Sequence, residues 1–183
     1  MSKPRRKFDF YETNTEAVQA LMDRVYLSMC VLEPCSGLGA ISDLITASVL
    51  HPTRAFRTVI TNDINPEMPS ETHVDACAID LRNTVDVVTN PPFNEAGRIV
   101  PYFVRRGHRC AFLLRLSWLE PTKGTANRKG RSEFLSQHPP SGLIVLPRYS
   151  FDGSGKKDLV TCAWMLWGFR MSPAIQIQEA NRG

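Results

Sequence analysis

The sequence contains no long apolar run, no closely paired cysteines and no clustered histidines. No stretch approaches the roughly 20 apolar residues that a membrane helix needs, and none follows the basic start MSKPRRKFDF, so we expect neither a membrane span nor a secretory signal. The five cysteines form no CxxC pair and the four histidines have no ligand spacing, so we expect no metal. Free thiols suit a reducing compartment, and we therefore expect a cytoplasmic protein.

Length and composition indicate one folded domain. The chain has 183 residues, of which 43% are hydrophobic and 22% are charged. These values argue against global disorder, and the length suffices to bury a core without disulfide or metal staples. We expect the domain to span 10–170, between a basic tail (1–9) and a C-terminal tail (171–183), with a basic loop inserted at 120–141.

The charged side chains are segregated along the chain. Residues 1–7 carry a net charge of +4, whereas residues 8–97 carry four basic and thirteen acidic side chains, a net charge of −9. Residues 98–131 carry nine basic side chains against Glu120 alone, a net charge of +8. This asymmetry favours a basic half that faces a polyanion. Two solvated faces with no partner account for the charges equally well.

Turn residues and apolar periodicity divide the chain into alternating strands and helices. Helices are expected over 13–27, 40–50 and 94–107, and a turn over 132–137. Strands are expected within 29–40, which ends in a glycine loop, and over 57–65, 74–80, 85–93, 108–119, 142–151 and 158–169. The last two strands are expected to form an antiparallel hairpin across 152–157.

This alternation predicts an α/β fold with a mostly parallel seven-stranded sheet and helices on both faces. Right-handed crossovers place the loops that follow parallel strands on one edge of the sheet. The residues in those loops are therefore the candidates for a functional site.

The first such loop is Glu33-Pro-Cys-Ser-Gly37-Leu-Gly39. A Gly-x-Gly turn between a strand and a helix lets the backbone approach a ligand closely. Ser42 stands where a dinucleotide fingerprint has its third glycine, which argues against a nicotinamide cofactor. The Glu33 carboxylate would repel a pyrophosphate and favour a cationic ligand.

Two acidic residues end later predicted strands. Asp63 lies 24 residues after Gly39 and is placed to accept hydrogen bonds from ribose hydroxyls, although an Asn-Asp pair also forms turns. Asp80 ends the strand predicted at 74–80, where it can accept from an adenine amino group or cap a helix.

Asn90-Pro91-Pro92-Phe93 ends the segment 85–93, directly after its β-branched strand residues. A lone Pro-Pro pair often only ends a strand. Here an amide, two rigid prolines and an aromatic ring lie together, on the same predicted edge as the glycine loop.

NPPF resembles the [DNS]PP[YFW] motif of S-adenosylmethionine-dependent methyltransferases that act on exocyclic or amide nitrogens. The glycine loop precedes it, as in N6-adenine DNA methyltransferases, and the carboxyl half is similar to small bacteriophage-type enzymes. The resemblance covers roughly Phe10 to Phe169. It implies a Rossmann-like class I methyltransferase fold, S-adenosylmethionine as cofactor, and the cytoplasm of a bacterium or of a bacteriophage-infected host cell.

The resemblance implies a catalytic role for Asn90, Pro91, Pro92 and Phe93. An adenine amino nitrogen is a poor nucleophile because its lone pair is delocalised into the ring. The Asn90 side-chain oxygen and the Pro91 carbonyl would accept both amino hydrogens, and the two prolines would hold these acceptors in place. Phe93 would stack on the extruded base. Methyl transfer would then depend mainly on how the amine and the cofactor methyl group are positioned relative to each other.

The resemblance also implies a set of cofactor-binding residues. They are Tyr11, Thr13, Glu33, Gly37, Gly39, Asp63 and Asp80. Tyr11 and Thr13 would lie near the methionine end of the cofactor, although the segment reads equally well as a helix cap with aromatic staples.

Substrate contacts are expected from the segment with the highest positive charge. The candidates are Arg115, Trp118, Lys123, Arg128, Lys129 and Arg131. Four of them belong to the stretch KGTANRKGR (123–131), which suits phosphate contact, although a solvated loop is a serious alternative. Trp164 and Trp167 are expected in the core instead.

The sequence has no evident target-recognition domain, so specificity is short, relaxed or supplied by a partner. We expect nucleic acid as the substrate, DNA ahead of RNA. Four alternatives stay open. Three are RNA adenine methylation, methylation of a protein glutamine amide, and a cofactor-binding module without catalysis. The fourth is a basic nucleic-acid-binding protein that keeps the fold but has no enzymatic activity.

Overall fold

Strands and helices alternate along the computed structural model, which describes residues 13–48, 58–81, 85–124, 130–148 and 160–179. The helices are α1 (Thr15–Met22), α2 (Ala40–Ala47), α3 (Ala96–Val104) and α4 (Ser132–Gln137), with 3-10 turns η3 (Ala76–Ala78) and η4 (Leu116–Leu119). The strands are β1 (Cys30–Glu33), β2 (Thr58–Thr61), β3 (Asp86–Thr89), β4 (Arg109–Arg115), β5 (Gly142–Val145), β6 (Cys162–Trp167) and β7 (Ile175–Ile177).

Within the described residues the strands form one seven-stranded sheet in the order β2-β1-β3-β4-β6-β5-β7. The pairs β1–β2, β1–β3, β3–β4 and β5–β7 are parallel, whereas β6 is antiparallel to both β4 and β5. The mostly parallel sheet and the antiparallel pairing of the two late strands are both confirmed. The predicted connection at 152–157 lies outside the described residues.

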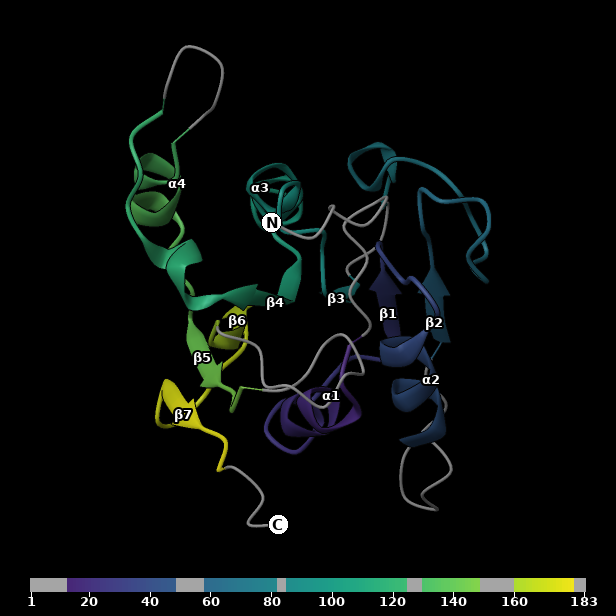
Figure 1. Ribbon diagram of the computed structural model, residues 1–183, viewed down its shortest axis with the longest axis horizontal. Helices are drawn as coiled ribbons and strands as arrows, with labels where there is room; N and C mark the ends of the chain where they lie inside the picture. Colours follow the sequence, from purple (N-terminus) through teal and green to yellow (C-terminus); the bar gives the residue numbers. More distant parts are fainter. Residues whose placement is uncertain (1–12, 49–57, 82–84, 125–129, 149–159, 180–183) are drawn as a thin grey trace, which may run out of the picture.

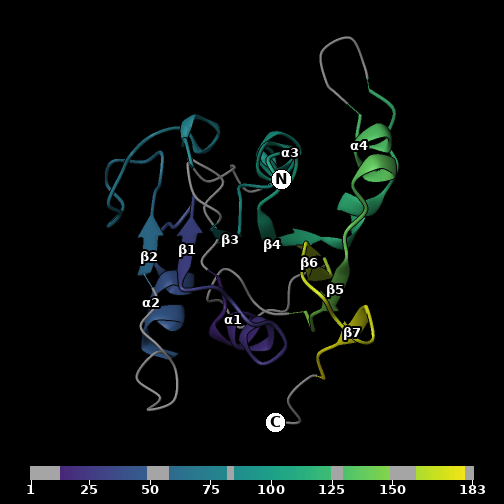
Figure 2. The ribbon, with the colours of Figure 1, turned by 180° about the vertical axis from the view of Figure 1, so that it is seen from behind.

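Helices cover both faces of this sheet (Figures 1 and 2). Alternate residues of β4 point to opposite sides, so Ala111 and Leu113 join one core cluster and Phe112 and Leu114 join another. The first cluster contains residues of α1 and α2, and the second contains residues of α3 and α4. A strand buried on both faces requires this continuous run of apolar side chains.

One predicted strand is wrong. Within residues 74–80 the chain forms the 3-10 turn η3 (Ala76–Ala78), and the Asp75 carboxylate accepts a hydrogen bond from the Cys77 N–H at 2.7 Å and caps this turn. The parallel bridge between Asn62 and Thr72 is the contact that this connection makes with the end of β2.

The seventh strand of the sheet is instead β7, which lies in the segment 171–183 that the sequence analysis assigned to a tail. Its register with β5 pairs Leu143 with Ile175. α4 lies where only a turn was expected. The two tryptophans expected in the core, Trp164 and Trp167, are buried there.

A buried ion pair joins the amino ends of β3 and β4. The Asp86 side chain is 2% exposed and accepts hydrogen bonds from Arg109 Nε at 2.8 Å and Nη2 at 2.6 Å. It also accepts from the Ser28 N–H at 2.6 Å, which ties the segment before β1 to the same carboxylate. Removing one partner would leave an uncompensated charge in the interior.

We expect Asp86→Ala to lower the free energy of unfolding by about 3 kcal/mol, because the Ser28 N–H loses its acceptor and the partly exposed Arg109 guanidinium loses both of its hydrogen bonds to this carboxylate. Urea unfolding measures this change. Glu95→Ala, which removes one ion-pair partner of the exposed Arg98, is the control and should cost well under half as much. Equal losses for the two variants would contradict a structural role for the buried pair.

Candidate functional site

The glycine loop after β1 has the backbone shape that its glycines predict. Gly37 and Gly39 have positive φ angles of 53° and 89°, and Gly39 precedes the first residue of α2. A Cβ atom on Gly39 would lie 3.3 Å from Ser42 Oγ, in a conformation that side chains rarely adopt. The Ser36 hydroxyl in this loop is buried and has no hydrogen-bond partner among the described residues.

Glu33, at the end of β1, is buried and points at the start of α2. Its Oε2 accepts a hydrogen bond from the Ser42 N–H at 2.9 Å, one of the helix N–H groups that has no partner within the helix. Burial raises the pKa of the Glu33 carboxyl from its ordinary value of 4.5 to about 8. Glu33 therefore fixes the start of α2, directly after the glycine loop.

Asp63 follows β2 and its carboxylate lies against the glycine loop. Oδ2 accepts from the Gly37 N–H at 2.9 Å, and Oδ1 accepts from the Asn65 N–H at 2.9 Å. Both oxygens thus engage backbone, and one of them holds the loop. Asp63 thus lies next to the glycine loop, and its expected hydrogen bonds to ribose hydroxyls stay a prediction.

Asn62 is a residue of this edge that sequence reasoning missed. It is fully buried, and its Nδ2 donates to the Pro34 and Val74 carbonyls, each at 3.0 Å. Its Oδ1 accepts from the Val74 N–H at 3.0 Å and from the Thr72 hydroxyl at 2.8 Å. The Asn62 side chain thereby joins the glycine loop to the connection before η3.

The NPPF segment begins directly after β3, and β3 lies beside β1. Asn90 Nδ2 donates to the Thr13 hydroxyl at 3.2 Å, although the two residues lie 77 positions apart. Thr13 is buried just before α1, whose start is capped by the Asn14 side chain. The structure thus brings together Thr13 and Asn90, which the resemblance had assigned separate roles.

The rest of the motif is held by the start of α3. The Pro92 carbonyl accepts from the Glu95 N–H at 2.9 Å and from the Ala96 N–H at 3.0 Å. Pro91 is buried, and Phe93 is partly buried against the core cluster that contains α1 and α2. The guanidinium of Arg115, the last residue of β4, lies 4.4 Å from the centre of the Phe93 ring.

The other predicted substrate residues lie apart from this group. Trp118 is 5% exposed and packs edge-on against Phe134 and Trp167 at 6.0 Å each. Arg131 lies over the Trp118 ring at 5.7 Å, and Lys123 is exposed. Tyr11, Arg128 and Lys129 lie outside the described residues.

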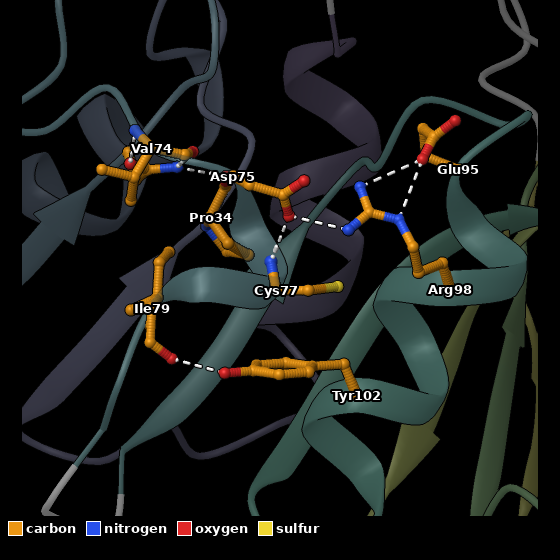
Figure 3. A network of polar contacts seen from close by, with 9 residues as sticks. Pro34, Val74, Asp75, Cys77, Ile79, Glu95, Arg98 and Tyr102 are labelled. Carbon is orange, nitrogen blue, oxygen red and sulfur yellow. Dashed lines mark hydrogen bonds and ion pairs between the residues drawn. The ribbon is translucent and has the colours of Figure 1, made fainter.

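Asp80 is exposed beyond η3, and the structure shows how its segment is fixed (Figure 3). The Tyr102 hydroxyl on α3 donates to the Ile79 carbonyl at 2.8 Å. Arg98, also on α3, pairs with Asp75 at 2.7 Å and lowers the pKa of that carboxyl. Because the first residue of α3 also hydrogen-bonds to Pro92, this helix contacts both the segment that carries Asp80 and the NPPF segment.

Two further classes of site receive no support in the described part of the chain. No group of three or more histidine, cysteine or acidic side chains there gathers in a way that would hold a metal ion. None of the helices described combines the length and the apolar character that a membrane crossing requires.

No protein-family model and no curated protein matches this chain. Solved structures do. A protein assigned as the modification subunit of a type I restriction enzyme from Vibrio vulnificus is 12% identical, with a TM-score of 0.61. The alignment covers 95% of this chain and 48% of that one, so the chain spans about half the length of this subunit.

Two further structures are similar over most of the chain. One is assigned as a class I S-adenosylmethionine-dependent methyltransferase from Listeria monocytogenes (12% identity, TM-score 0.53, covering 91% of this chain and 60% of that one). The other is the 23S rRNA methyltransferase ErmE (16% identity, TM-score 0.57, covering 93% and 72%). The chain thus has the Rossmann-like fold of class I methyltransferases, as predicted.

We expect Glu33→Gln to stabilise the protein increasingly as the pH rises from 5 to 8. In this range the unfolded chain loses the Glu33 proton while the folded chain keeps it, so the wild-type free energy of unfolding falls, by at most about 1.4 kcal/mol per pH unit from this group. Glutamine has no proton to lose and still offers Ser42 an acceptor. Urea unfolding at several pH values measures the difference, with the exposed Glu71→Gln as control. A difference independent of pH would contradict the burial effect.

Proposed function

We propose that this protein transfers a methyl group from S-adenosylmethionine to the exocyclic N6 amine of adenine, in DNA ahead of RNA. The observation that carries the proposal is the hydrogen bond from Asn90 Nδ2 to Thr13, at the edge where the NPPF segment lies beside the glycine loop. That bond holds the Asn90 amide at this edge of the sheet through its nitrogen. The amide also carries an oxygen, the kind of acceptor that an amino-group substrate needs.

The residues around the glycine loop fit S-adenosylmethionine. The buried Ser36 hydroxyl lacks a hydrogen-bond partner within the described residues, and Gly37 and Gly39 let a ligand approach the backbone. The Asp63 carboxylate beside the loop suits a ligand that carries a sulfonium charge, whereas the raised pKa of Glu33, about 8, leaves that carboxyl mostly uncharged near pH 7. We propose that this loop, Thr13, Asp63 and the exposed Asp80 hold the cofactor, with Glu33 supporting the loop. When bound, the cofactor supplies an electrophilic methyl group.

In this proposal the NPPF segment binds and orients the target amine. Asn90 Oδ1 and the Pro91 carbonyl accept its two hydrogens, whereas the Pro92 carbonyl already accepts from the N–H groups of Glu95, just before α3, and of Ala96, its first residue. The amine lone pair is then drawn out of conjugation and aimed at the cofactor. Phe93 stacks on the base. Rigid prolines keep the acceptors in place before the substrate arrives.

Transfer of a labelled methyl group tests the proposal. Duplex DNA, single-stranded DNA, ribosomal RNA and a protein extract are offered in parallel with labelled S-adenosylmethionine, and the products are digested and analysed as nucleosides and amino acids. Label in N6-methyladenine from DNA supports the proposal. Label in glutamine, or intact cofactor binding with no transfer to any substrate, contradicts it.

RNA adenine is the second candidate, and one observation favours it. The chain covers 72% of the rRNA methyltransferase ErmE but 48% of the restriction modification subunit. Because this chain corresponds to only 48% of the modification subunit, we also propose that a separate partner supplies sequence specificity.

A further part of the proposal concerns the residues near the substrate. We propose that they are Trp118, Lys123 and Arg131, together with Arg128 and Lys129.

We expect Asn90→Ala to lower turnover at least a hundredfold while cofactor affinity stays near the wild-type value, because an acceptor for the developing charge is lost. Thr13→Val should lower turnover about tenfold, because the Asn90 amide loses the contact that orients it. Methyl transfer and calorimetric titration measure the two effects. Thr46→Val on the exposed side of α2 is the control. Wild-type turnover in the Asn90 variant would contradict the assignment.

A further inference from the structure

Arg115 occupies a fixed position beside the NPPF segment. It is the last residue of β4 and pairs with Cys162 of β6, and the next N–H, that of Leu116, donates to the Thr161 carbonyl at 3.0 Å. β3, which leads into Asn90, runs parallel to β4 on its other side. β6 therefore holds the backbone of Arg115 on one side, while β3, whose last pair with β4 is Thr89 with Phe112, leads into the NPPF segment on the other.

The Arg115 guanidinium stacks on the Phe93 ring but forms no ion pair with the described residues. It lies 4.4 Å from the centre of the Phe93 ring, a contact that suits a planar cation. Its Nε is buried and has no hydrogen-bond partner among the described residues. None of the ion pairs found in the described residues includes Arg115. A buried N–H without an acceptor is costly, so the arrangement suits a ligand that completes it.

The acidic groups of the neighbouring loops are engaged elsewhere. Glu33 accepts from the Ser42 N–H, and both oxygens of Asp63 accept from backbone N–H groups. Arginine has only donors, arranged in a planar fork that matches a carboxylate or a phosphate. An anionic ligand would therefore suit Arg115, whose Nε has no acceptor and which forms no ion pair among the described residues.

We propose that Arg115 binds a backbone phosphate next to the target nucleotide, with its guanidinium held in place by Phe93. The inference rests on the proposed function and deepens it, since it assigns the substrate group that this residue recognises. A nucleotide that stacks its base near Phe93 carries a phosphate on each side of its sugar, within reach of a side chain that touches the same ring. A protein amide substrate offers no such group.

The experiment uses the full chain and an oligonucleotide substrate found by the labelled-methyl assay. Each phosphate around the target adenine is replaced in turn by an uncharged methylphosphonate, and kcat/KM is measured for the wild type and for Arg115→Met. We expect one linkage at which the replacement lowers wild-type kcat/KM about tenfold to a hundredfold and leaves the Arg115→Met value unchanged. Arg115→Gln gives the same comparison if the Met variant does not fold.

Arg105→Met is the matched control. Arg105 also lies over an aromatic ring, 5.7 Å from the centre of Phe134, but it is exposed beyond the last residue of α3. This variant should keep the full wild-type response at the same linkage.

Equal responses of the wild type and the Arg115 variants at every linkage would overturn the inference and leave the proposed function standing. A loss of S-adenosylmethionine affinity in Arg115→Met, with an unchanged response to the methylphosphonates, would also overturn it, because the anion bound would then be the cofactor carboxylate. A wild-type protein that methylates no oligonucleotide contradicts the proposed function itself, and the inference falls with it.

Discussion

The buried amide of Asn62 holds together the segments on which the candidate site is built. Its nitrogen and oxygen engage the glycine loop and the connection before η3, and its backbone carbonyl accepts from the Ser36 N–H at 2.9 Å. A buried polar group is tolerated only where its hydrogen bonds are satisfied, so this network permits one arrangement of the loops. Asp63 then adds a second tie to Gly37. The position of the glycine loop relative to the connection before η3 depends on this constraint.

The edge that carries the site was predictable because its signals are local. Glycines with positive φ, an acidic residue after a strand and a proline pair after a strand each reveal a turn from a few neighbouring residues. The parallel topology then places those turns together. Asn62 was not predictable in the same way. Its side chain bonds to residues 12 and 28 positions away, and a polar residue beside Asp63 looks like ordinary turn chemistry.

The errors in the fold prediction have the same origin. Residues 74–80 alternate in a way that suits a strand, but a single side-chain cap at Asp75 turns the segment into η3. β7 has only three residues and its two isoleucines are exposed, so the sequence has no apolar periodicity that would predict this strand. Its place in the sheet comes from register with β5, which lies more than 25 residues earlier in the chain. The contact between Arg115 and Phe93 likewise depends on two neighbouring strands rather than on sequence spacing.

The direction of β6, which runs antiparallel to both of its neighbours β4 and β5, has a consequence for how this domain can be extended. β5 ends, and β6 begins, at the same edge of the sheet at which β3 and β4 end. Val145, the last residue of β5, and Cys162, the first residue of β6, therefore both lie at the edge of the sheet that carries the candidate site. Lengthening a loop costs little conformational entropy and leaves the ladder intact. The connection between these two residues is thus a natural insertion point for a substrate-reading module, which would be delivered to the site without any change to the sheet or to the residues of the NPPF segment.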